Sequence, residues 1–159
     1  MAEAETIDFS SLTIRKLLCR DERQFLEKCR SILSDLTGEE FIASSPDWLR
    51  FATMQLESDG YCEILKMSID YTQEIVYELP KELCHLYEDR EQYDMFAEQL
   101  SNARMIYNTL NGVAVIPVHY IEDDDLLRDH FRNKLHLLTR FRVWVGSPRC
   151  KCPPLRCVD

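Results

Sequence analysis

The chain has 159 residues, of which 45% are hydrophobic and 30% are charged, and its formal net charge is −9. This length suits one domain, and the composition is that of a folded protein rather than a disordered, collagenous or repetitive chain. No apolar run approaches the roughly 18 residues that a membrane span requires. The first residues are acidic, whereas a signal peptide begins with basic residues and continues with apolar ones. The sequence therefore predicts an intracellular protein, cytoplasmic or nuclear, without a transmembrane segment.

The charge is distributed unevenly along the chain. Residues 1–125 contain 26 acidic and 11 basic residues, a net charge of −15, whereas residues 126–159 contain 2 acidic and 8 basic residues, a net charge of +6. An acidic body repels nucleic acids and anionic membranes, while a basic end either folds back onto that body or meets an acidic partner. Folding back is the simpler expectation.

The N-terminal third is expected to be helical. Apolar residues recur at three- and four-residue steps from Ser10 to Thr37, which predicts a helix that ends at Gly38. Asp21 and Gln24 have the spacing of a capping box, so a pair of helices divided near Arg20 is the alternative.

Residues 48–79 are ambiguous between strands and helix. Apolar and polar residues alternate from Leu65 to Thr72, and Asp59-Gly60 is typical of a hairpin turn. This pattern favours an antiparallel meander of about three strands. The alternative is a helix from Leu65 to Leu79.

The C-terminal half shows a clearer order of elements. Pro80 to Leu110 is expected to form a long central helix with an acidic face, and residues 113–121 a strand in which Pro117 indicates an edge position or a bulge. Residues 122–125 cap a short helix that ends near Leu138, and residues 141–145 alternate as a last strand. The whole predicts one α+β domain over residues 1–146 with a Cys/Pro-rich basic tail at 147–159.

The seven cysteines fall into two groups. Four lie singly among apolar residues and are expected to be reduced core residues, namely Cys19, Cys29, Cys62 and Cys84. The other three crowd into the tail, namely Cys150, Cys152 and Cys157. Three thiolates could bind zinc with a fourth ligand from His119, His130 or His136, although two separated Cys-x-x-Cys pairs would be the usual pattern. Free thiols and reversible acylation are the alternatives for the tail.

Support for catalysis in the sequence is thin. There is no Gly-x-Ser-x-Gly, His-Glu-x-x-His or glycine-rich phosphate loop. Cys84 and His85 are neighbours, but adjacent side chains on a helix point about 100° apart and do not form a nucleophile–base pair. An enzyme with a thiol site assembled across the fold is therefore the third hypothesis.

The expected function is a non-catalytic protein–protein interaction module, a small adaptor or complex subunit of an intracellular assembly. The predicted partner contacts combine basic residues with an aromatic anchor, as protein interfaces do: Arg140, Arg142, Trp144, Arg149, Lys151 and Arg156. The predicted edge strands at 113–121 and 141–145 could accept a partner strand. The second hypothesis is a zinc-stabilised nucleic-acid-binding protein, which the acidic body disfavours. A homodimer is compatible with either hypothesis.

Overall fold

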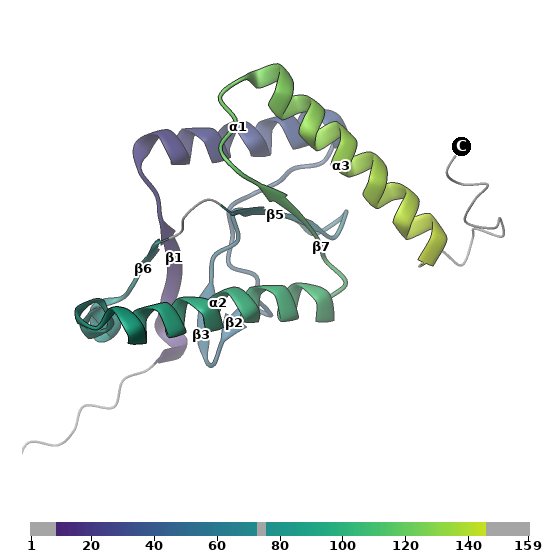
Figure 1. Ribbon diagram of the computed structural model, residues 1–159. Helices are drawn as coiled ribbons and strands as arrows, with labels where there is room; N and C mark the ends of the chain where they lie inside the picture. Colours follow the sequence, from purple (N-terminus) through teal and green to yellow (C-terminus); the bar gives the residue numbers. More distant parts are fainter. Residues whose placement is uncertain (1–8, 73–75, 146–159) are drawn as a thin grey trace, which may run out of the picture.

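The computed structural model describes residues 9–72 and 76–145, with side chains as far as residue 138. The chain is a mixture of helices and strands, as predicted (Figure 1). The helical elements are η1 (Phe9–Ser11), α1 (Arg20–Thr37), η2 (Lys81–Glu88), α2 (Arg90–Leu110) and α3 (Asp124–Val145), of which η1 and η2 are 3₁₀ helices. The strands are β1 (Thr13–Leu17), β2 (Arg50–Phe51), β3 (Met54–Leu56), β4 (Gly60–Cys62), β5 (Met67–Tyr71), β6 (Val76–Glu78) and β7 (Ala114–Val118).

The strands of the described residues form two mixed sheets. The first has the order β2-β3-β1-β6, with β1 parallel to β3 and antiparallel to β6. The second has the order β4-β5-β7, with β5 antiparallel to β4 and parallel to β7. The prediction of strands between residues 48 and 79 is thus confirmed over the helical alternative. Their arrangement differs from a single meander because β1 and β7 insert beside them from distant parts of the chain.

The predicted helix over residues 10–37 is confirmed only from Arg20 onward. In β1, Ile14 and Lys16 are buried while Arg15 and Leu17 are exposed, which is the two-residue alternation of a strand. Helix α1 begins after Cys19, whose backbone N–H donates to a Glu22 side-chain oxygen at 3.1 Å. The capping box therefore lies two residues before the predicted one.

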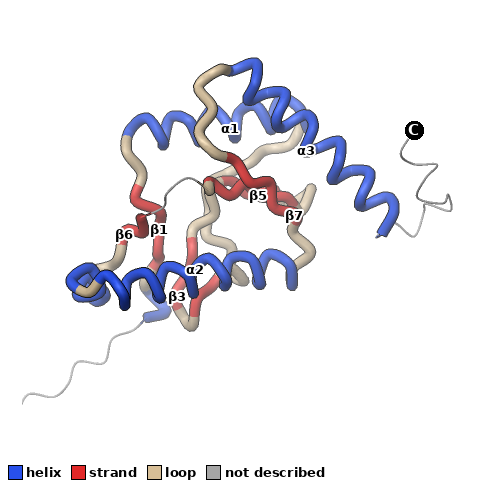
Figure 2. Tube along the Cα trace, viewed as in Figure 1, coloured by secondary structure: helices blue, strands red, loops and turns tan. Residues whose placement is uncertain are grey.

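The second sheet is covered on its two faces by different helices (Figures 1 and 2). Alternate residues of β5, namely Met67, Ile69 and Tyr71, join a core formed with α1 and α3. The intervening residues Ser68 and Asp70 face the opposite side, where the C-terminal half of α2 lies. The N-terminal half of α2 packs on the first sheet, so this helix spans both sheets.

The long central helix is interrupted at Asp89. Helix η2 ends there, and the Asp89 carboxylate accepts hydrogen bonds from the backbone N–H groups of Glu91 and Gln92 at 3.1 and 3.3 Å. An N-cap aspartate of this kind begins a new helix and typically stabilises it by about 1 kcal/mol. Helix α2 ends at Leu110, and Gly112 adopts a positive φ of 68°, as expected for the predicted end.

Helix α3 begins as predicted but continues further. Asp123 accepts backbone hydrogen bonds from Asp125 and Leu126 at 2.9 and 3.1 Å, and the helix then runs to Val145. The predicted last strand at residues 141–145 is therefore wrong. Its alternation is short, and no glycine or proline separates it from the helical pattern that precedes it.

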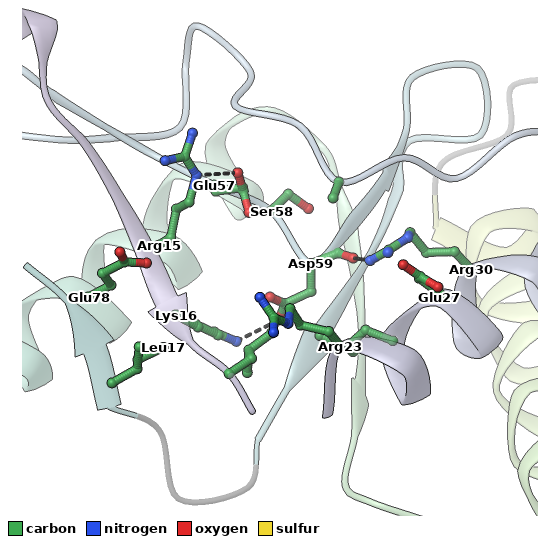
Figure 3. A pocket seen from close by; sticks show the side chains of 13 residues that line it. Arg15, Lys16, Leu17, Arg23, Glu27, Arg30, Glu57, Ser58, Asp59 and Glu78 are labelled. Carbon is green, nitrogen blue, oxygen red and sulfur yellow. Dashed lines mark hydrogen bonds and ion pairs between the residues drawn. The ribbon is translucent and has the colours of Figure 1, made fainter. Parts of the chain in front are cut away.

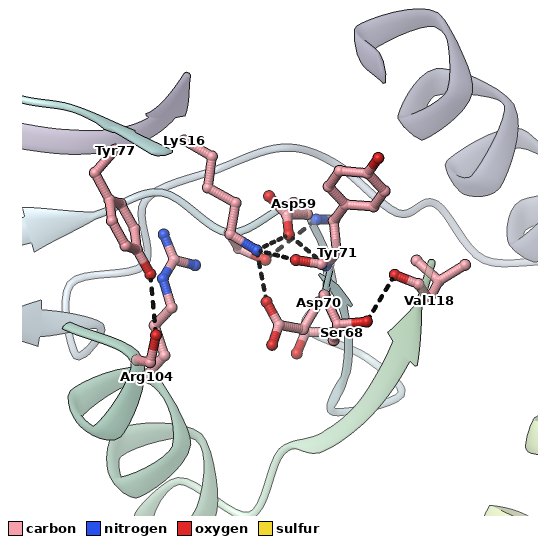
Figure 4. Close-up of polar contacts among 12 residues, drawn as sticks. Lys16, Asp59, Ser68, Asp70, Tyr71, Tyr77, Arg104 and Val118 are labelled. Atoms are coloured by element: carbon pink, nitrogen blue, oxygen red, sulfur yellow. Dashed lines mark hydrogen bonds and ion pairs between the residues drawn. The ribbon is translucent and has the colours of Figure 1, made fainter. Parts of the chain in front are cut away.

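Lys16 joins the two sheets through a buried network of charged groups (Figure 4). Its ammonium group donates to Asp59 Oδ2 at 2.6 Å, to Asp70 Oδ1 at 2.6 Å and to the carbonyl oxygen of Tyr71 at 2.9 Å. Asp59 Oδ2 also accepts from the Tyr71 N–H at 2.8 Å, and the Asp59 carbonyl accepts from Arg30 Nη1 at 2.7 Å. Only 2% of the Lys16 side chain and 6% of the Asp59 side chain are exposed. We call Lys16, Asp59, Asp70 and the Tyr71 backbone the Lys16 network.

None of the helices in the described ranges is long and apolar enough to cross a membrane.

Replacing Lys16 by methionine should lower the free energy of unfolding by about 3–5 kcal/mol, because Asp59 then stays buried without its cation. Urea denaturation followed by circular dichroism measures this loss. Lys28→Met is the matched control, since Lys28 pairs with Asp124 at 2.7 Å on the exposed surface, where ion pairs contribute about 1 kcal/mol or less. Equal losses in the two variants would contradict a central role for Lys16.

Candidate functional site: a cavity beneath the long helix

A cavity of about 410 Å³ lies between the second sheet and the C-terminal half of α2. We call it the α2 cavity. Its sheet wall is formed by Ser68 and Asp70 of β5 and by Val115 and Pro117 of β7. The remaining lining residues come from α2, from the segments that hold Leu49 and Ser58, and from Ile69 of β5; those of α2 are Ser101, Asn102, Arg104, Met105 and Asn108. A volume of this size suits a small ligand.

Arg104 is the most unusual group in this cavity. The residue is only 7% exposed, and its Nε and Nη2 atoms are buried without a hydrogen-bond partner in the described part of the chain. These two N–H groups share one edge of the guanidinium, and such an edge can bind both oxygens of a carboxylate. Each buried donor without a partner costs about 1–3 kcal/mol, so native proteins rarely retain one without a reason.

Arg104 is held from the side of the first sheet. Its guanidinium carbon lies 5.8 Å from the centroid of the Tyr77 ring, a favourable cation–π arrangement. Tyr77 is 2% exposed, and its hydroxyl lies 3.4 Å from Ser101 Oγ. Figure 4 shows the Arg104 side chain beside this ring, on the side of the Lys16 network. The cation is therefore positioned by packing and by an aromatic face, neither of which uses its N–H donors.

Asn108 fixes the helix wall of the cavity. Its side-chain N–H group donates to the Arg104 carbonyl at 2.7 Å, and its side-chain oxygen accepts from Ser68 Oγ at 3.4 Å. Its own carbonyl accepts from the Val113 N–H at 2.8 Å. These contacts use both ends of the Asn108 amide. The charged residues that line the cavity are Arg104 and Asp70.

A second cavity, of about 400 Å³, lies on the other side of the Lys16 network (Figure 3). It is more highly charged, and three of its four cations already have partners, whereas the fourth, Arg23, is exposed. Arg15 pairs with Glu57 at 2.8 Å, and Arg30 donates to the Asp59 carbonyl. The α2 cavity is the stronger candidate site because its cation is buried and two of its donors have no hydrogen-bond partner among the described residues.

The described residues do not test the predicted partner-binding residues. Positions 140, 142 and 144 lie in the last turns of α3, where position 142 is about 200° around the axis from each of the other two, while 140 and 144, four residues apart, share a helix face. Their side chains, and the whole of Arg149, Lys151 and Arg156, lie outside the described residues.

Strand β7 is an edge strand, as Pro117 predicted, but its edge offers little to a partner strand. Backbone groups of Ala114 and Val118 form hydrogen bonds with the β5 side of the sheet. Because the backbone hydrogen-bonding direction alternates along a strand, the backbone groups of Val115 and Pro117 point to the free edge. Pro117 has no N–H, and its carbonyl accepts from His130 Nε2 at 3.0 Å. Strand addition at residues 113–121 is therefore opposed by the structure.

The cysteine prediction is half confirmed. Cys29 and Cys62 are buried core residues, whereas Cys19 and Cys84 are exposed. The predicted zinc ligands Cys150, Cys152 and Cys157 lie outside the described residues. Across residues 9–72 and 76–138, no three His, Cys, Asp or Glu side chains are grouped closely enough to hold a metal ion.

Comparisons with known proteins identify no relative. No family model matches the chain, and no curated protein or solved structure is significantly similar to it. The chemistry of the site therefore has to be taken from its own residues.

The sequence did contain one signal for Arg104. Leu100, Ala103 and Tyr107 mark the apolar face of α2, and Arg104 lies on that face between them. A basic residue on the buried side of a helix requires a partner or a ligand.

Alkylation of the native protein at neutral pH should modify Cys19 and Cys84 and spare Cys29, as mapped by peptide mass spectrometry. Burial raises the pKa of the Cys29 thiol to about 12, so its reactive thiolate is scarce as well as inaccessible. Denatured protein is the control, in which all cysteines should react. Rapid modification of Cys29 in the native protein would contradict its place in the core.

Proposed function

We propose that the protein is a non-catalytic binding module that holds a small carboxylate-bearing ligand in the α2 cavity. The observation that carries this proposal is the pair of buried Arg104 donors, Nε and Nη2, without a hydrogen-bond partner in the described residues. A bidentate carboxylate would satisfy both donors at once and offset the cost of burying them, once the guanidinium edge, which is inaccessible in this structure, has turned toward the cavity.

The surroundings disfavour a ligand that brings more than one negative charge. Asp70 also lines the cavity, and Lys16 is already engaged with Asp59 and Asp70. A phosphate group carries about −1.5 to −2 at neutral pH and would be repelled by Asp70 with only Arg104 to balance it. Met105, Val115 and Pro117 supply apolar walls for the carbon skeleton of a carboxylate.

The hydroxyl groups in the cavity support binding rather than catalysis. A serine nucleophile requires an adjacent general base. Ser68 donates to the Asn108 amide oxygen, Ser101 contacts the Tyr77 hydroxyl, and Ser58 Oγ accepts from the Gly60 N–H. None of these partners is an imidazole or a carboxylate, the usual general bases, so the contacts support a structural role for the three hydroxyls.

The variant Arg104→Met should fold with a free energy of unfolding that is unchanged or higher by up to about 2 kcal/mol, because it removes an unsatisfied buried cation. It should also abolish binding of hexanoate, followed by the NMR shift of the Arg104 Nε–Hε signal in the wild type and by calorimetry in both proteins.

The matched control is Arg30→Met. Arg30 donates a satisfied hydrogen bond to the Asp59 carbonyl, so its loss should destabilise the protein by about 1–3 kcal/mol and leave hexanoate binding intact. Hexanoate binding to Arg104→Met with the affinity of the wild type would contradict the proposed function.

A protein-interaction module remains the second candidate, and one observation moves its contact surface to α2. The C-terminal end of this helix exposes three large apolar side chains, Met105, Ile106 and Leu110, which are 63%, 52% and 73% exposed. Contiguous apolar residues of this kind mark interaction surfaces. The basic residues between 140 and 156 remain proposed contacts for the same partner.

The double variant Ile106→Ser/Leu110→Ser should reduce capture of a protein partner by about tenfold or more, because buried apolar anchors supply most interface energy. Quantitative mass spectrometry of proteins captured by wild-type and variant baits measures this. Met95→Ser is the control, since Met95 is 57% exposed but lies in the N-terminal half of α2. Identical capture by all three baits would rule out this surface.

A further inference from the structure

Two charged side chains line the α2 cavity, two more are connected to it through the ion pair of Lys16 with Asp70, and the formal charges of the four cancel. Lys16 and Asp59 pair at 2.6 Å and are almost fully buried. Asp70 and Arg104 are the remaining pair, and both line the cavity. No ion pair within 4.0 Å joins Arg104 to Asp70 in the described residues. The cavity thus presents one positive and one negative group that do not neutralise each other directly.

Asp70 can accept a further hydrogen bond from a ligand. Its Oδ1 atom accepts from Lys16 Nζ, whereas no described residue bonds to its other carboxylate oxygen. The Asp70 side chain is 39% exposed, in contrast to the 2% of Lys16, so its free oxygen is accessible from outside the buried network.

We propose that the ligand of the α2 cavity is a small aminocarboxylate, with its carboxylate on the Nε and Nη2 atoms of Arg104 and its ammonium on Asp70. This inference rests on the proposed function and names the ligand class of the same site. A zwitterion adds no net charge to a region whose own charges already cancel, whereas a simple carboxylate would bring an uncompensated negative charge close to Asp70. The carbon skeleton between the two charged groups lies against Met105 and Val115.

The test compares ligands that share a six-carbon skeleton and differ only in charged groups. Hexanoate carries the carboxylate alone, hexylamine the ammonium alone, and 2-, 4- and 6-aminohexanoate carry both at increasing separation. Calorimetry should show at least one aminohexanoate binding about tenfold or more tightly than hexanoate, because a charge-assisted hydrogen bond to Asp70 is added. The preferred isomer reports the spacing between Asp70 and Arg104.

The variant Asp70→Asn tests whether Asp70 causes the preference for an aminohexanoate over hexanoate. It keeps the size of the side chain and leaves Lys16 paired with Asp59, and circular dichroism confirms whether it folds. In this variant the preferred aminohexanoate should bind within about twofold of hexanoate, since the partner of the ammonium has lost its charge. An unchanged preference in a folded Asp70→Asn protein would overturn the role of Asp70.

The ligand series also separates the two proposals without any variant. If hexanoate binds and every aminohexanoate binds no more tightly, the zwitterion inference fails while the carboxylate site stands. If hexylamine binds as tightly as the best aminohexanoate, or if no ligand binds, both proposals fail.

Discussion

The ammonium group of Lys16 is the interaction on which the rest of the structure depends. It lies in the central part of the first sheet and bonds to Asp59, Asp70 and the Tyr71 carbonyl of the second sheet region, so it fixes the distance between the sheets. The two cavities lie on either side of this network, and Ser58 lines both. Replacing a buried ion pair of this kind by apolar residues is often neutral or stabilising, whereas breaking one is costly. The network thus sets the geometry of the cavities more than it adds net stability.

Arg104, in contrast, contains groups that lower the stability of the fold. Its backbone carbonyl accepts a hydrogen bond from Asn108 and its guanidinium contacts the Tyr77 ring, but two of its donors are buried without partners in the described chain. A folded protein that satisfies local rules elsewhere and breaks one at a cavity wall has the pattern of a binding site. Helix α2 places Arg104 at the cavity because its N-terminal half packs on the first sheet and its C-terminal half lies over the cavity.

The sequence predicted those features that depend on neighbouring residues. The end of α1 at Gly38, the edge position of Pro117 and the start of α3 after Asp123 were all set by local chemistry. The predictions that were wrong concern features that depend on residues far apart in the sequence. Lys16 meets Asp59 and Asp70, which are 43 and 54 residues away, and no local pattern reveals such contacts. The strand around Lys16 was therefore assigned to a helix, because its apolar residues also fit three- and four-residue steps. Arg104 was within reach of the sequence, since it interrupts an apolar helix face.

A crystal structure of the protein grown with hexanoate tests the central claim most directly. The account predicts a carboxylate bound side-on to Arg104, with its two oxygens within about 3 Å of Nε and Nη2, and the aliphatic chain against Met105. The contradicting result is an Arg104 side chain that pairs directly with Asp70 in a cavity without bound hexanoate. In that structure the guanidinium would need no ligand, and its role would be confined to joining α2 to the second sheet.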